Sequence, residues 1–100
     1  MEILKKQIYI TKREKINILE IKNGHRLKFF SYTYRVTDKS GENRPIVRWD
    51  NFGGSIHFDV FDTNQNLISQ QKCEYKNPNE ILRLVKIFRH NLANMDVKLL

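Results

Sequence analysis

The chain has 100 residues, of which 40% are hydrophobic and 29% are charged, and its formal net charge is +7. This composition is typical of one globular domain over residues 1–100, and it excludes an intrinsically disordered or membrane-spanning chain. The single cysteine excludes an internal disulfide and a CxxC zinc site. Without a signal-peptide pattern, we expect a cytoplasmic protein.

The first seventy-odd residues are rich in alternating apolar and polar side chains, which indicates strands. Predicted strands cover residues 5–11, 15–21, 26–36, 46–51, 55–62 and, more weakly, 67–75. Asn23-Gly24 predicts a tight hairpin between two of them. The phase slip at Phe29-Phe30 predicts a bulge or burial on both faces. The polar residues 38–45 predict a loop.

The last quarter of the chain changes to helical spacing. Asn77 is the predicted N-cap, Pro78 the first helical residue and Glu80 the third. Apolar residues then recur every three or four positions, which places one helix face in the core. We therefore predict an α+β fold, with an antiparallel β-meander of about five strands and one C-terminal helix packed on one face.

Basic residues lie on the other side of this helix, at Arg83, Lys86 and His90, with Arg89 adjacent. They are compatible with a ridge that binds phosphates, or with a solvated face whose cations sit near the helix C-terminus. The apolar residues of 95–100 indicate a short strand, a contact with a partner, or a frayed end. The net positive charge favours nucleic acid over a membrane surface or an acidic protein as a partner.

The segment 48–59 carries four ionisable residues around a glycine pair. If Gly53-Gly54 forms the centre of a hairpin turn, the register separates the two faces chemically. Apolar residues fall together on one face, and the ionisable set on the other is Arg48, Asp50, His57 and Asp59. Opposite residues in such a ladder have Cβ atoms about 5 Å apart, so these side chains can pair.

Such a face can transfer protons and bind an anion. Asp50 would orient His57, which acts as acid or base near neutrality, and Arg48 would bind a phosphate while Asp59 tunes the site. The alternative is a pair of surface ion pairs, worth about 0.2–1 kcal/mol each. Asp50, His57 and Asp59 could also ligate a metal, but no metal-binding spacing supports this, so we predict neither metal nor cofactor.

Two tyrosines, Tyr32 and Tyr34, share one face of a predicted strand and are flanked by basic residues. Tyrosines in this setting can stack on the exposed bases of nucleic acids. The alternative is packing in the core, which we favour for at least one of them.

The pattern Tyr32-x-Tyr34, a polar loop and then Arg48-Trp49-Asp50-Asn51 resembles the TumE-type toxins of prokaryotic toxin–antitoxin pairs, over roughly residues 25–95. This resemblance implies a basic protein with a strand-rich body and a C-terminal helix, with ribonuclease-like activity and a cognate antitoxin. Arg48, Asp50 and Asn51 match the motif. Residues 52–55 stand where the family has a histidine pair, and only His57 follows in this segment.

The leading hypothesis is a small basic toxin that acts on RNA as a metal-independent ribonuclease. One rival is a non-catalytic nucleic-acid-binding or regulatory module of a mobile element, which binds through Arg83, Lys86 and Arg89. Another is a protein adaptor that uses residues 95–100. The sequence leaves the target RNA, the partner and the oligomeric state open.

Overall fold

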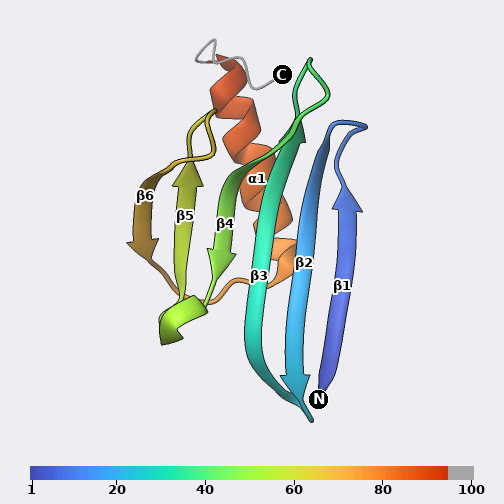
Figure 1. The fold of residues 1–100 in the computed structure, drawn as a ribbon, viewed down its shortest axis with the longest axis vertical. Coiled ribbons are helices and arrows are strands. Elements are labelled where there is room, and N and C mark those ends of the chain that lie inside the picture. Colours follow the sequence, from blue (N-terminus) through green and yellow to red (C-terminus); the bar gives the residue numbers. More distant parts are fainter. Residues whose placement is uncertain (95–100) are drawn as a thin grey trace.

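The computed structural model describes residues 1–94, which form one antiparallel sheet and one long α-helix (Figure 1). The strands lie side by side in chain order, β1 to β6, as a meander. Their bounds are β1 Glu2–Tyr9, β2 Glu14–Asn23, β3 Arg26–Thr37, β4 Asn43–Asp50, β5 His57–Phe61 and β6 Leu67–Lys72. The predicted α+β meander with a C-terminal helix is confirmed, with six strands where about five were expected.

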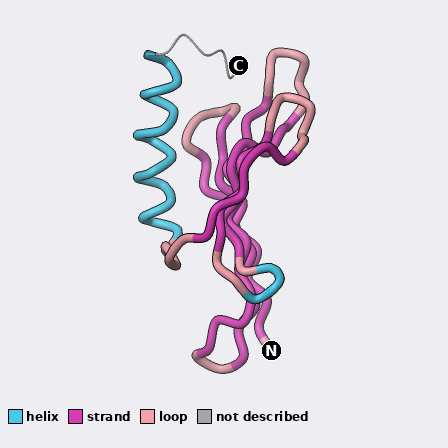
Figure 2. Tube along the Cα trace, turned by 90° about the vertical axis from the view of Figure 1, so that its left-hand side faces the viewer, coloured by secondary structure: helices cyan, strands magenta, loops and turns pink. Residues whose placement is uncertain are grey.

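The helix α1, Pro78–Asn94, forms a separate layer on one face of the sheet (Figure 2). It lies closest to β3. Ile81 and Val85 of the helix are buried, and burial of each such side chain is worth about 1.5–3 kcal/mol. The sheet side of this core consists of Ile16, Ile18, Phe30, Tyr32, Tyr34, Val36, Val47 and Trp49. Within residues 1–94, no α-helix covers the opposite face, which we call the bare face.

The helix begins where the sequence predicts. The backbone N–H of Glu80 donates to Asn77 Oδ1 at 3.0 Å, and Asn77 Nδ2 donates back to Glu80 Oε1 at 3.0 Å. This reciprocal pair satisfies one of the free N–H groups of the first turn. No helix within residues 1–94 combines the length and apolarity that a bilayer crossing requires.

Two irregularities in β3 and β4 shape the bare face. The pairing of β2 with β3 shifts so that Lys28 has no partner, which confirms the predicted bulge near Phe29-Phe30. Phe30 is buried under the helix, whereas Phe29 lines a hollow on the bare face. The predicted loop is too long, because β4 begins at Asn43. A register shift at Ile46 accompanies Pro45, as expected for proline at a bulge.

Candidate functional site

The β4–β5 hairpin has the predicted register. Arg48 pairs with Asp59 and Asp50 pairs with His57, so all four ionisable residues share the bare face. The turn is longer than predicted, because the strands end at Asp50 and resume at His57, with a short 3₁₀ turn between them. Its Gly53 and Gly54 have φ values of 81° and 93°, which side chains rarely tolerate.

Asn51 fixes this loop to the neighbouring strand. Its Oδ1 accepts from the backbone N–H of Phe30 at 3.0 Å, and its Nδ2 donates to the carbonyl of Lys28 at 3.1 Å. These bonds satisfy backbone groups at the β3 bulge. Asn51 therefore acts by positioning the loop, while the ionisable residues beside it form the candidate site.

Arg48 holds both carboxylates of the cluster. Its Nη2 donates to Asp59 Oδ2 at 2.8 Å, and its Nε lies 2.9 Å from Asp50 Oδ2. The Nε–H is not aligned on that oxygen, so this contact is an ion pair without a hydrogen bond. The guanidinium also lies over the ring of Phe61, 5.2 Å from its centroid. Asp50 and Asp59 are buried, whereas 39% of the Arg48 side chain is exposed.

His57 completes the cluster. Its Nδ1 lies 3.0 Å from the carbonyl oxygen of Ser55, and its Nε2 lies 2.8 Å from Asp50 Oδ1 and 3.7 Å from Asp59 Oδ2. A carbonyl and a carboxylate both accept, so both ring nitrogens are satisfied only when both carry hydrogen. With the imidazolium, two positive groups face two negative ones. The position of the ring therefore suits donation by both nitrogens.

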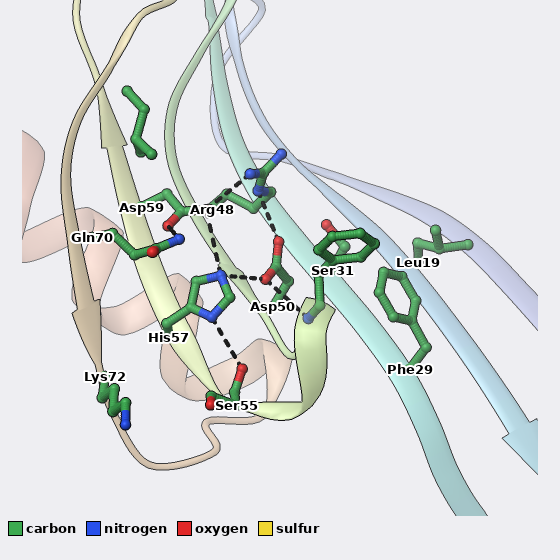
Figure 3. Close-up of a pocket in the computed structure, with 12 residues that line it drawn as sticks. Leu19, Phe29, Ser31, Arg48, Asp50, Ser55, His57, Asp59, Gln70 and Lys72 are labelled. Carbon is green, nitrogen blue, oxygen red and sulfur yellow. Dashed lines mark hydrogen bonds and ion pairs between the residues drawn. The ribbon is translucent and has the colours of Figure 1, made fainter.

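The cluster lines an open hollow of about 710 Å³ on the bare face (Figure 3). Arg48, Asp50 and His57 lie on one side of it, and Leu19 and Phe29 lie on the other. The hollow therefore joins a charged wall to an apolar one. The full lining is Leu19, Phe29, Ser31, Arg48, Asp50, Phe52, Ser55, His57, Asp59, Leu67, Gln70 and Lys72.

Three of these residues could also ligate a metal ion. Asp50, His57 and Asp59 each offer one ligand atom, and these atoms lie within 4.8 Å of one another. Two carboxylate oxygens and one imidazole nitrogen suit several divalent ions. The guanidinium of Arg48 already neutralises the same carboxylates, and a metal would compete with it.

Sequence reasoning missed several residues of the site. Gln70 Nε2 donates to Asp59 Oδ1 at 2.9 Å, and Lys72 pairs with His57 in the ladder. Phe52 lines the hollow with 75% of its surface exposed. The alternation of residues in β6 places Gln70 and Lys72 on the same face. Their partners in β5 could not be predicted from the sequence, because the register shifts at Ile68. The sequence signal for Phe52 is its place directly before Gly53-Gly54, in a turn, where a phenylalanine has little chance of burial.

The structure corrects the expected role of the two tyrosines. Tyr32 and Tyr34 are both fully buried under the helix, so neither ring can stack on a base. Tyr34 Oη donates to Glu14 Oε1 at 2.6 Å, and Tyr32 Oη donates to Glu20 Oε2 at 2.5 Å. Core packing was expected for at least one of them, and the helix covers both.

The structure removes Arg89 from the predicted basic ridge of the helix. Arg83 and Lys86 are exposed, but Arg89 turns towards the sheet. Its Nε and Nη2 each lie 2.7 Å from an oxygen of the buried Glu14. This corrects the assignment of Arg89 to nucleic-acid binding, because its fork is already occupied by a carboxylate. The prediction for residues 95–100 lies outside the described residues.

Comparisons with protein-family models, with curated proteins and with solved structures find no match for this chain. The resemblance to TumE-type toxins therefore stays a prediction.

Proposed function

We propose that this chain is a small basic protein that cleaves RNA by acid–base chemistry at Arg48, Asp50, His57 and Asp59, without a metal ion. The observation that carries the proposal is the environment of His57. Both of its ring nitrogens face acceptors, and it lines an open hollow together with cationic side chains. A proton held this way can be passed to a substrate.

The reaction needs one proton removed and one supplied. The ribose 2′-oxygen attacks phosphorus, the bond from phosphorus to the 5′-oxygen breaks, and a 2′,3′-cyclic phosphate forms. His57 Nε2–H gives its proton to the departing 5′-oxygen. The proton of the 2′-hydroxyl passes to Asp50, whose Oδ1 lies 2.8 Å from Nε2 and returns it to the ring.

Charge on the phosphate also needs stabilisation. The Arg48 side chain is 39% exposed and lines the hollow, so its guanidinium can turn a donor towards a non-bridging oxygen. Asp59 is fully buried and receives donors from Arg48 and Gln70, so it limits where the guanidinium can move. These roles match the residue types that phosphodiester cleavage requires.

A place in a toxin–antitoxin pair is part of the same proposal. It is supported by the resemblance of the Arg48–Asn51 motif to TumE-type toxins and by the formal charge of +7. A cognate antitoxin is then the expected protein partner. The rival, a nucleic-acid-binding module without catalysis, would now rely on the exposed Arg83 and Lys86, since Arg89 is paired.

The test is cleavage of a mixed-sequence RNA by purified protein, in buffer with EDTA. We expect His57→Gln to lower the rate by about 10²–10⁴-fold, the usual contribution of a general acid. His25→Gln is the matched control, because His25 is exposed in the β2–β3 turn, away from the cluster. Circular dichroism would verify that both variants are folded.

Three results would contradict the proposal. One is wild-type protein that cleaves no RNA, and a second is His57→Gln with full activity and undiminished growth inhibition. The third is activity that EDTA abolishes and a divalent ion restores, which would assign Asp50, His57 and Asp59 to a metal instead.

A further inference from the structure

A second hollow lies beside the first on the bare face. It has a volume of about 450 Å³, and Lys5, Gln7, Asn17 and Thr33 contribute to its lining. Leu19 and Ser31 line both hollows, so the two are continuous. The bare face thus offers an elongated surface that is larger than the ion cluster alone requires.

The strand register explains how the two hollows are joined. Pairing partners from β1 to β6 form one row straight across the sheet, namely Lys5, Leu19, Ser31, Asp50, His57 and Lys72. With strands about 4.8 Å apart, this row is about 24 Å long. A lysine stands at each end and the proton-transfer pair lies between them. A linear polyanion could therefore contact both lysines while it crosses His57.

The neighbouring row contains a buried polar atom without a partner. Asn17 stands between Gln7 and Thr33 in the ladder, and its Oδ1 is buried with no donor among the described residues. An unsatisfied buried acceptor is costly, so a ligand that donates to it would gain affinity. The hydroxyl of a ribose or the amino group of a base can donate in this position.

Apolar and aromatic groups complete the surface. Phe29 and Phe52 line the first hollow next to the ion cluster, and Phe52 is 75% exposed. The two rings offer a stacking surface beside the ion cluster. Unpaired bases stack on such rings, whereas a duplex hides the faces of its bases.

We infer that the bare face binds single-stranded RNA as an extended strand running across the six β-strands. The scissile phosphate lies at Arg48 and His57, an adjacent base stacks on Phe52, and a neighbouring nucleotide occupies the hollow of Lys5 and Asn17. This inference rests on the proposed function and adds the class of substrate and its direction across the sheet.

Binding is measured by fluorescence anisotropy with a labelled 2′-O-methyl octanucleotide of mixed sequence, which the proposed reaction cannot cleave. We expect Phe52→Leu to weaken binding about tenfold, the loss of one base stack, and Phe52→Trp to preserve it. Lys5→Gln should weaken binding of the octanucleotide but not of a dinucleotide, which is too short to reach it. The same sequence as a duplex should bind more weakly than the single strand.

Lys86→Gln is the matched control for Lys5→Gln, because Lys86 is exposed on the helix, on the other side of the sheet. Its binding should equal that of the wild type. If the wild type cleaves RNA while Phe52→Leu and Lys5→Gln bind normally, the inference is wrong and the proposed function stands. If Lys86→Gln alone weakens binding, the helix is the contact surface and the inference is likewise wrong. If the wild type neither binds nor cleaves RNA, both proposals are wrong.

Discussion

Two buried ion clusters lie on opposite faces of the sheet, and in each an arginine holds carboxylate oxygens. Under the helix, Arg89 holds Glu14 with two contacts of 2.7 Å. On the bare face, Arg48 holds Asp50 and Asp59 at 2.9 Å and 2.8 Å. The clusters are similar in chemistry and in the burial of their carboxylates, so their surroundings must distinguish their roles.

The Glu14 cluster is closed. Burial raises the pKa of Glu14, but hydrogen bonds from Arg89, Tyr34 and Thr11 outweigh it, so the pKa lies below its usual value. Burial, together with the bond to Glu14, raises the pKa of Tyr34. Glu14 is therefore ionised and Tyr34 neutral across the physiological range. This cluster attaches the helix to the sheet.

The cluster on the bare face differs in two respects. Its hydrogen bonds are complete only with a proton on His57, and it lines a hollow that a ligand can enter. A buried carboxylate bound by an arginine therefore does not by itself mark a functional site, because Glu14 and Arg89 form such a pair under the helix. An imidazole that faces acceptors and also lines accessible space is the better criterion.

The largest stability effect that tests this distinction is expected for Arg89→Met. It leaves Glu14 buried without its cation, and breaking such a pair costs about 3–5 kcal/mol when both groups are buried. Because 38% of the Arg89 side chain is exposed, we expect about 2–3 kcal/mol less free energy of unfolding in urea. Arg83→Met, on the exposed side of the same helix, should change it by less than about 0.5 kcal/mol.

RNA cleavage by folded Arg89→Met should match that of the wild type. A large loss of rate at unchanged fold would show that the Glu14 cluster contributes to activity, and the distinction between the two clusters would fail.

The local pattern was sufficient to predict the β4–β5 hairpin. Alternation across Gly53-Gly54 placed Asp50 opposite His57 because a slipped register would mix charged and apolar faces. It did not predict what covers each face. Glu14 and Arg89 are 75 positions apart, and no local signal connects them. Tyr32 and Tyr34 are core residues because the helix packs on their face of the sheet, which the local pattern does not show.

The second prediction, of intermediate size, concerns how the contribution of Glu14 to the unfolding free energy depends on pH. The pKa of Glu14 in the folded protein is below its ordinary value of 4.5, so its contribution is complete above that pH and is lost as the pH falls through the folded value. Below pH 4.5, the difference in unfolding free energy between wild type and Glu14→Gln should therefore shrink, by at most about 1.4 kcal/mol per pH unit.

Urea denaturation at a series of pH values measures this difference. Glu2→Gln is the control, because Glu2 is exposed on β1 and takes no part in the Glu14 cluster. A constant difference between wild type and Glu14→Gln down to the acid limit would contradict the assignment of Glu14 as a stabilising anion.

The smallest expected change in unfolding free energy comes from removing one uncharged hydrogen-bond donor from each cluster. This pair of variants compares the roles of the two clusters most directly. Tyr34→Phe removes a bond to Glu14, and Gln70→Leu removes a bond to Asp59. A bond to a buried carboxylate is worth about 1–2 kcal/mol, so Tyr34→Phe should lower the unfolding free energy by that amount. Gln70 is exposed, and water can replace its amide, so Gln70→Leu should cost less.

The rates of RNA cleavage should follow the opposite order. Asp59 Oδ2 lies 3.7 Å from His57 Nε2 and 2.8 Å from Arg48 Nη2, so a displaced Asp59 changes the position of both groups. Gln70→Leu should therefore lower the rate while Tyr34→Phe leaves it unchanged. If Tyr34→Phe lowers the rate and Gln70→Leu does not, the hydrogen bonds under the helix, and not those on the bare face, support the chemistry.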